Sequence, residues 1–341
     1  MSPPPPATPS LPHDADRTPA VSVVVPAYNV AGFIGPCLDS VLAQSLLAWE
    51  CLVVDDGSRD DTAERVTRFT DPRIRLLRQA NGGVSAARNA GLAAARGTAV
   101  MFLDGDDLLH PTALARLDAA LRDHAGAVAA FGSFVKLLAD GTPYPQQKPL
   151  AQHRYPSGDV LLPMIRENFL ANGGHVLVRT DAAQRIGGFD VALRLSEDWE
   201  FWCRLAAQGT FQFIGSVPEV FSLRVRPGSA SGPLAADWAN HQHSLDAVLG
   251  NPELRRRFEH VVWQALGREV RASHMWEAGR VNFTIRRFPE ARRLMLRSLR
   301  LAPRRKRLAL FLLAQVSQVA NRSLVSRLRF VDDDRRAIQV E

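Results

Sequence analysis

Short apolar runs alternate with segments of helical spacing through the first third of the chain. Four of these runs are predicted strands, at 21–28, 50–54, 74–77 and 98–103. Predicted helices lie between them, at 33–44, at 60–69 and in the alanine-rich part of 81–97. Nearly continuous apolar runs are typical of parallel strands buried on both faces. The alternation therefore predicts an α/β fold of the nucleotide-binding type, with a sheet flanked by helices.

The middle of the chain mixes strand and helix signals less regularly. A helix is predicted from Pro111 to about His124, and the segments after it are a strand at 128–137, a polar hairpin at 140–148 and a strand at 172–178. A further helix is expected after Ser196, which is a predicted N-cap followed by two acidic residues in the first turn.

The last third of the chain is rich in Arg, Ala and Leu and has few strand signals. This change places a domain boundary near Leu234. Helical spacing then predicts one helix, a turn at 287–289 and a second helix that ends before Pro303. The pair resembles one tetratricopeptide-like hairpin, and because a single hairpin cannot bury its own apolar faces, we expect it to pack on the main domain.

Composition and charge narrow the classes of protein. The 341 residues are 46% hydrophobic and 23% charged, which describes an ordinary globular protein with ample core material. The net charge is +7, and residues 280–307 hold eleven Arg and Lys against Glu290 alone. The basic excess therefore belongs to the C-terminal helices, which we expect to contact an anionic membrane surface through 280–330. Little aromatic interleaving argues against nucleic acid as the partner.

Other features bear on the compartment. The three cysteines, Cys37, Cys51 and Cys203, are widely spaced and are predicted to be buried free thiols, which fits a reducing cytoplasm. The proline-rich residues 1–19 are predicted to be a disordered tail rather than a secretory signal. The apolar stretch 308–320 is too short to span a bilayer. We therefore expect a cytoplasmic protein, with peripheral contact to the inner face of the membrane.

Polar turns follow the four predicted strands of the first third of the chain. These turns contain Tyr28, Asp55 with Asp56, Gly83, and Asp104 to Asp107 in the sequence FLDGDD. In open parallel sheets, ligands bind beyond the carboxyl ends of the strands, so these turns should converge on one edge. The three carboxylates of FLDGDD should raise one another's pKa unless a positive group lies among them.

Five motifs in order carry a family resemblance. They are VSVVVPAYN at 21–29, CLVVDDGSRDDT at 51–62, NGGVSAARNAGL at 81–92, FLDGDD at 102–107 and SEDWEFWCRL at 196–205. Together they resemble family 2 glycosyltransferases with the GT-A fold. The resemblance implies a GT-A domain at 20–234 and a helical, Arg-rich extension at 235–341. It also implies an inverting enzyme that moves a sugar from a nucleotide-diphosphate donor to an acceptor hydroxyl, in cell-surface glycan or polysaccharide synthesis. A nucleotide-sugar-binding protein without activity is the alternative.

The resemblance assigns the acidic turn to a divalent cation, Mn²⁺ or Mg²⁺. Its Asp-x-Asp element corresponds to Asp104 and Asp106, with Asp107 adjoining. Such cations take oxygen ligands and often use one or two carboxylates together with phosphate and water. We expect Asp106 or Asp107 at the metal and another of the three near the ribose, with the order open.

Other positions correspond to donor recognition in the family. Asp56 matches the position that binds the base or ribose, and Asp55 either shares this role or forms an Asx turn. Tyr28 either contacts the base or lies at the edge of the core. Arg88, one helical turn after Gly83, either faces the diphosphate or is a solvated helix charge.

The acceptor half of the reaction is assigned to the helix that starts near residue 197. Inversion requires a base that deprotonates the acceptor hydroxyl, and the family's Glu-Asp pair matches Glu197 and Asp198. Asp198 is the candidate base, with Glu197 as an orienting group; the alternative is that both only complement the helix dipole. Trp199 and Trp202 either form a sugar-stacking wall or belong to the core.

Two further positions stay open. Many relatives have a His where this sequence has Arg226; an arginine cannot ligate a metal but can pair with phosphate oxygens. His175 either lies in the acceptor site or is structural.

Overall fold

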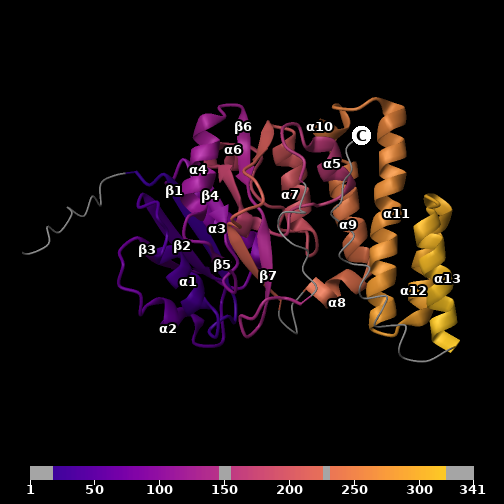
Figure 1. Ribbon diagram of the computed structural model, residues 1–341, viewed down its shortest axis with the longest axis horizontal. Helices are drawn as coiled ribbons and strands as arrows, with labels where there is room; N and C mark the ends of the chain where they lie inside the picture. Colours follow the sequence, from indigo (N-terminus) through magenta and orange to yellow (C-terminus); the bar gives the residue numbers. More distant parts are fainter. Residues whose placement is uncertain (1–17, 146–154, 226–230, 320–341) are drawn as a thin grey trace, which may run out of the picture.

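The computed structural model describes residues 18–145, 155–225 and 231–319. Of the expected tail at 1–19, only the last two residues fall within this part. Two sheets and a C-terminal set of helices make up the fold (Figure 1). It confirms the predicted α/β class with a helical extension.

The larger sheet has seven strands in the order β3-β2-β1-β4-β8-β6-β9. Its strands are β1 (Val21–Ala27), β2 (Trp49–Asp55), β3 (Ile74–Arg78), β4 (Ala99–Phe102), β6 (Ala127–Phe131), β8 (Val176–Arg179) and β9 (Thr210–Phe213). The first four lie parallel, as predicted, whereas β8 runs antiparallel to both β4 and β6. The sheet is therefore mixed, and its parallel half carries the polar turns.

A smaller sheet of three strands covers the turn after β4. Its order is β5-β10-β7, made of β5 (Leu108–Leu109), β7 (Phe134–Leu138) and β10 (Phe221–Val225). The strand predicted at 128–137 is wrong as one element, because β6 ends at Phe131 and β7 begins at Phe134 in the other sheet. The strand predicted at 172–178 starts late, since Gly173–His175 forms a short 3-10 turn before β8.

Helices cover both faces of the larger sheet (Figure 1). They are α1 (Ile34–Leu42), α2 (Thr62–Val66), α3 (Val84–Ala94), α4 (Ala113–Asp123), α5 (Leu161–Arg166), α6 (Thr180–Arg185) and α7 (Glu197–Ala206). Side chains alternate along each strand, so that Val23 and Val25 pack toward α1 while Val24 packs toward α3 and α7. This alternation places one apolar cluster on each face of the sheet, and the cysteines are buried and free as predicted.

The C-terminal helices stand beside α7 at one end of the molecule (Figure 1). They are α8 (Ser231–Ala236), α9 (Trp238–Leu249), α10 (Pro252–Arg255), α11 (His260–Thr284), α12 (Phe288–Leu301) and α13 (Arg305–Val319). The predicted hairpin is confirmed as α11 and α12, and it packs on the main body as expected. Leu245 of α9 and Trp263 of α11 belong to the same apolar cluster as α7, so the core continues past the predicted boundary near Leu234. No helix of the described residues is long and apolar enough to cross a bilayer.

Candidate active site

The carboxyl ends of three parallel strands bring the polar turns to one edge of the sheet. β1 pairs with β2 in the register Ala27 to Asp55, and with β4 in the register Val24 to Phe102. The backbone N–H of Asp56 donates to the carbonyl of Ala27 over 2.9 Å. The turns after these strands are therefore direct neighbours, as the parallel pattern predicts.

Asp107 anchors the acidic turn through buried hydrogen bonds. It is 1% exposed; its Oδ1 accepts the backbone N–H of Arg224 at 2.7 Å, and its Oδ2 accepts Asn172 Nδ2 at 2.8 Å. The same amide reaches Asp104 Oδ2 at 3.2 Å. Burial, and then the charges of Asp104 and Asp106, raise the pKa of Asp107 well above its ordinary value. Asp107 thus connects β10 and the turn that contains Asn172 to the acidic turn. Asp104 and Asp106 are half-buried beside it.

The positive group that the acidic turn requires is the guanidinium of Arg88. This side chain is buried on α3, with Nη2 3.0 Å from Asp104 Oδ1 and Nη1 2.9 Å from Glu197 Oε1. Burial opposes its charge, but Asp104 and Glu197 outweigh burial and raise the Arg88 pKa. The alternative of a solvated helix charge is therefore wrong. One arginine joins the acidic turn to the first residue of α7.

Asp198 occupies the first turn of α7, as predicted. Its Oδ1 accepts the backbone N–H of Trp199 at 2.7 Å, and its Oδ2 accepts Asn168 Nδ2 at 3.0 Å. Burial, and then the charge of Glu197, raise the pKa of Asp198 to about 7, although Arg88 acts in the opposite direction. A carboxylate whose pKa lies near neutrality suits general base catalysis.

The start of α7 has an unusual backbone. Ser196 stands at the N-cap with φ 57°, in the left-handed region, and its side chain makes no capping hydrogen bond. The predicted position of the cap is therefore confirmed, but the predicted capping hydrogen bond of Ser196 is absent. The left-handed residue turns the chain so that the helix begins directly at the acidic pair.

The turn after β2 is fastened to the glycine turn that opens α3. Asp56 Oδ1 accepts the backbone N–H of Gly82 and Oδ2 that of Gly83, each at 2.8 Å. Gly83 has φ 87°, a value that favours glycine. Asp55 is buried and accepts the N–H of Ser58 at 3.1 Å. Both acids thus shape this edge, whereas the side chain of Tyr28 is 44% exposed there.

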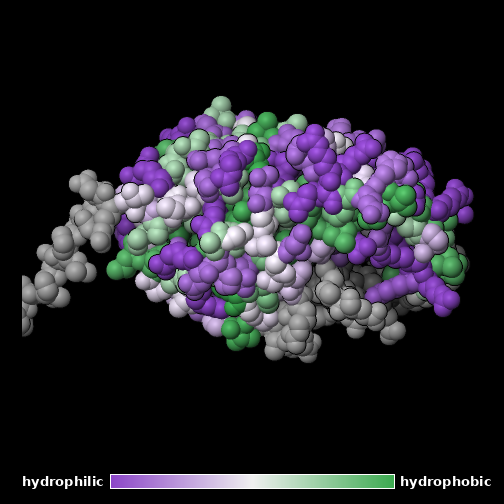
Figure 2. Space-filling model, turned by 90° about the horizontal axis from the view of Figure 1, so that it is seen from above, coloured by the Kyte–Doolittle hydropathy of each residue, from purple (hydrophilic) through white to green (hydrophobic). Residues whose placement is uncertain are grey.

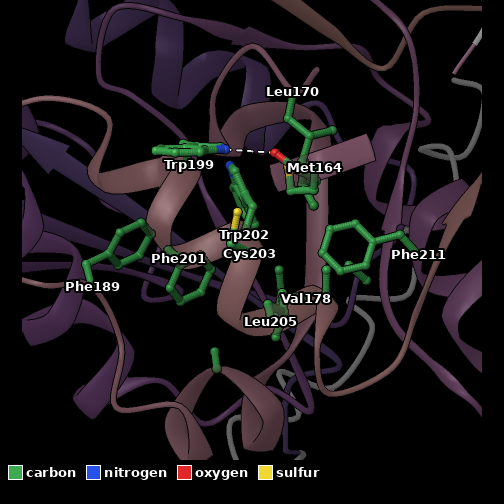
Figure 3. Close-up of a cluster of buried hydrophobic side chains, with 14 of the residues drawn as sticks. Met164, Leu170, Val178, Phe189, Trp199, Phe201, Trp202, Cys203, Leu205 and Phe211 are labelled. Carbon is green, nitrogen blue, oxygen red and sulfur yellow. Dashed lines mark hydrogen bonds between the residues drawn. The ribbon is translucent and has the colours of Figure 1, made fainter. Parts of the chain in front are cut away.

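Four other candidate positions have different outcomes. Trp199 and Trp202 are buried within the apolar cluster of Figure 3, where Trp199 Nε1 donates to the carbonyl of Met164 at 2.7 Å. They belong to the core, so the sugar-stacking wall is wrong. His175 is fully buried, with its ring nitrogens hydrogen-bonded to Gly132 O and Ala171 N, which is the structural alternative. Arg226 lies outside the described residues.

Comparison with known proteins identifies the family. Residues 22–186 match the family described as glycosyl transferase family 2. The succinoglycan biosynthesis protein ExoO of Rhizobium meliloti is 34% identical over 253 residues, which cover 71% of this chain and 70% of ExoO. The chain belongs to glycosyltransferase family 2.

Other family members align over shorter regions. The uncharacterized glycosyltransferase EpsJ of Bacillus subtilis is 48% identical over 101 residues, covering 29% of each chain. The hyaluronan synthase of Pasteurella multocida is 40% identical over 101 residues, 29% of this chain but 10% of its own length. The chain thus matches less than a third of the length of these two curated relatives.

Solved structures support the GT-A fold. TarS of S. aureus in complex with UDP-GlcNAc has a TM-score of 0.63 at 18% identity, covering 92% of this chain and 90% of the TarS chain. The mannosyltransferase PcManGT of Pyrobaculum calidifontis, in complex with GDP-Man and Mn²⁺, has a TM-score of 0.55 at 20% identity, covering 92% and 85%. At these identities the likeness concerns the fold.

The carboxylates of the acidic turn are candidate ligands for a divalent cation. Within residues 18–145, 155–225 and 231–319, no three His, Cys, Asp or Glu side chains gather into a cluster able to hold a metal by themselves. The half-buried Asp104 and Asp106 do offer the hard oxygen donors that Mg²⁺ and Mn²⁺ prefer. Such a donor set fits a cation that shares its coordination with substrate phosphates and water.

Sequence reasoning missed three side chains at this site. Asn168 contacts the candidate base, Asn172 bridges two of the acids, and Arg224 holds the turn through Nε, which donates to the carbonyl of Asp106 at 2.9 Å. All three approach from segments far away in the sequence, so no local motif marks them. For Arg224 the only available signal was its place two residues before Arg226.

Proposed function

We propose that this protein is an inverting, metal-dependent glycosyltransferase that moves a sugar from a nucleotide-diphosphate donor to an acceptor hydroxyl. The observation that supports this proposal best is the bridge made by Arg88. It holds Asp104 of the acidic turn and Glu197 of the acceptor helix on one guanidinium, at 3.0 and 2.9 Å. The bridge holds the acidic turn and the start of α7 in a fixed relation, and fixed positioning of two substrates favours a displacement reaction.

On the donor side, each residue has a distinct proposed role. The exposed ring of Tyr28 faces the base, and Asp56 recognises the base or ribose from the turn it also stabilises. Asp55 and Gly83 shape that turn without contacting the donor. A divalent cation held by Asp104 and Asp106 would neutralise the charge of the leaving diphosphate. Arg88 and Asp107 hold both ligands in place, and Arg226 is proposed to pair with phosphate oxygens.

On the acceptor side, Asp198 takes the proton of the acceptor hydroxyl. The hydroxyl oxygen then forms a bond to the anomeric carbon as the bond to the diphosphate oxygen breaks, and the diphosphate leaves with the electron pair. Attack opposite the leaving group inverts the anomeric centre. Asn168 and the backbone N–H of Trp199 orient the carboxylate, and its pKa of about 7 allows it to accept a proton near neutral pH.

A panel of nucleotide sugars, assayed for hydrolysis with Mn²⁺ and with Mg²⁺, tests the proposal. The donor that is hydrolysed identifies base, sugar and metal together. Asp198→Asn should bind that donor as tightly as the wild type but turn it over at least about a hundredfold more slowly. Equal turnover by the variant would exclude Asp198 as the base.

The acceptor is proposed to be a lipid-linked or cell-surface glycan in polysaccharide biosynthesis, in keeping with the name of the relative ExoO. A cytoplasmic enzyme of this kind would work at the membrane surface. Arg297, Arg300 and Arg305 are exposed on α12 and α13 and provide positive charge for anionic lipid. In the view of Figure 2, hydrophilic residues with small apolar patches cover this end of the molecule, which favours an electrostatic contact over an inserted one.

Liposome sedimentation tests the membrane contact. Replacing Arg297, Arg300 and Arg305 by Gln should reduce binding to vesicles with anionic lipid, since each charge near such a surface contributes about 1 kcal/mol. Arg307 is unsuitable for this test because it is buried and donates to Ser273 Oγ at 2.8 Å. Binding that is unchanged in the triple variant would exclude this surface.

A further inference from the structure

A pocket of about 480 Å³ lies among the C-terminal helices, away from the acidic turn. It is formed where the start of α9 meets the turn between α11 and α12 (Figure 1). The side chains in its wall that can interact with a ligand are Asp237, Trp238, Asn282, Arg287, Glu290 and Arg293. Pockets of this size with a few convergent polar groups are typical of small-molecule or ligand-unit sites.

Polar groups in the wall are left available for a ligand. Among the residues that the structure describes, the exposed Arg287 guanidinium has no carboxylate partner and no side-chain hydrogen bond. Asn282 is 1% exposed, and its Nδ2 donates to the carbonyls of Ala236 and Ala278 at 2.6 and 2.9 Å. Its buried Oδ1 has no partner in the described part of the chain. An unpaired buried acceptor is costly, but this oxygen is enclosed by protein, so the Arg287 guanidinium is the group that a ligand can reach.

The pocket also contains an aromatic surface and balanced charge. Trp238 is half-buried and stacks on His241 with 6.0 Å between ring centroids. Glu290 pairs with Arg293 at 2.9 Å, and Asp237 Oδ1 accepts the N–H of Ala239 at 3.0 Å. The wall thus contains two acids and two arginines. A strongly anionic ligand would meet the acids as well, whereas a sugar presents hydroxyls that both donate and accept, together with an apolar face for the indole.

Ring contacts connect the pocket to the proposed base. His241 lies against His274 of α11 with 5.4 Å between ring centroids, and His274 lies against Trp199 at 4.8 Å. Trp199 follows Asp198 directly and donates its backbone N–H to that carboxylate. The helices that form the pocket, α9 and α11, therefore also connect, through His241 and His274, to the residue that follows the proposed base.

We propose that this pocket binds a sugar residue of the acceptor glycan, a few units from the hydroxyl that is glycosylated. Arg287 would hydrogen-bond its hydroxyls and Trp238 would cover its apolar face. A remote contact of this kind would select acceptors by chain length. The inference rests on the proposed transferase activity for its biological meaning, but the binding itself can be measured without turnover.

Nuclear magnetic resonance of the full chain provides the test. The chain has six tryptophans, so the indole N–H resonance of Trp238 can be assigned by its loss in Trp238→Phe. The probes are glucose, galactose, mannose, N-acetylglucosamine and glucuronate, each titrated to millimolar concentration. At least one should shift the Trp238 resonance saturably. Arg287→Ala should weaken that binding about tenfold, as expected for one lost charge-assisted hydrogen bond, while Arg292→Ala, at an exposed position of the adjoining α12, should not.

The outcomes separate this inference from the proposed function. A Trp238 resonance that responds to none of the five sugars, or a binding that Arg287→Ala leaves unchanged, would overturn the pocket assignment. Hydrolysis of nucleotide sugars by the same sample tests the transferase independently. Sugar binding at Trp238 without hydrolysis of any donor would support the pocket and count against the proposed activity.

Discussion

Replacing Arg88 by Gln removes the one charge that joins Asp104 to Glu197. Gln is close in length but has no charge, and its single NH2 group cannot donate to both carboxylates as the guanidinium does. Two acids then face each other across a buried position without compensation. We expect the variant to be less stable and to require a higher pH for activity.

The structure sets the size of both effects. Each hydrogen bond to the guanidinium is worth about 1.5–3 kcal/mol, and removing one partner of a buried pair costs about 3–5 kcal/mol. The side chains of Asp104 and Glu197 are 28% and 16% exposed, so water recovers part of this loss. The expected decrease in unfolding free energy is therefore about 3 kcal/mol. Because Arg88 lowers the pKa of Asp198, its loss should move the acid limb of the pH–rate profile upward by about one pH unit.

Urea unfolding and a pH profile of donor hydrolysis measure the two effects. Arg65→Gln is the matched control, because its pair with Asp61 is exposed on both sides and worth less than about 1 kcal/mol. If Arg88→Gln fails to fold, Arg88→Lys keeps the charge and should retain the fold with reduced turnover. An Arg88→Gln enzyme with wild-type stability and an unmoved acid limb would refute the role of the bridge.

Three further predictions concern the base and the metal. Asn168→Ala removes a hydrogen bond that lowers the Asp198 pKa, so the acid limb should rise while the donor Kd stays constant; a purely structural residue would leave the limb in place. The pKa of Asp198 is about 7 in the folded state against about 3.9 unfolded, so its ionisation costs stability as pH rises through this window. Asp198→Asn should therefore be about 4 kcal/mol more stable than the wild type above pH 8 and equal to it below pH 4, by urea unfolding; a difference independent of pH would contradict the shift. Asp106→Asn should raise the Mn²⁺ concentration for half-maximal hydrolysis at least about tenfold, and an unchanged requirement would remove Asp106 from the metal site.

The parallel half of the fold could be predicted because its signals are local. Nearly continuous apolar runs mark β1, β2 and β4, and a polar turn follows each. The break between β6 and β7 was missed because only Gly132 and Ser133 separate them, and the second strand continues the apolar pattern. A Cβ on residue 132 would lie only 2.8 Å from the Val220 side chain. The need for glycine in this turn therefore comes from a residue 88 positions away in the sequence. The short strands β5, β9 and β10 have 2 to 5 residues, too few for periodicity to show.

The site was predictable in its charged residues but not in their partners. The motifs pointed to Asp104, Arg88 and Asp198, because each stands in a turn or first helical turn with a recognisable pattern. That Arg88 pairs with Glu197 depends on a contact between residues 109 positions apart. The distinction between Asp107 as an anchor and its half-buried neighbours Asp104 and Asp106 likewise depends on Asn172 and on β10. Tertiary contacts of this kind leave no trace in one sequence.

Donor hydrolysis and donor binding, measured together in the wild type and in Asp198→Asn, test the central claim most directly. Isothermal titration gives the Kd for the hydrolysed nucleotide sugar, and turnover is followed with the same metal. We predict an unchanged Kd and at least about a hundredfold loss of turnover, because the variant keeps the size of the side chain but cannot accept the proton. Turnover at the wild-type rate would contradict the account.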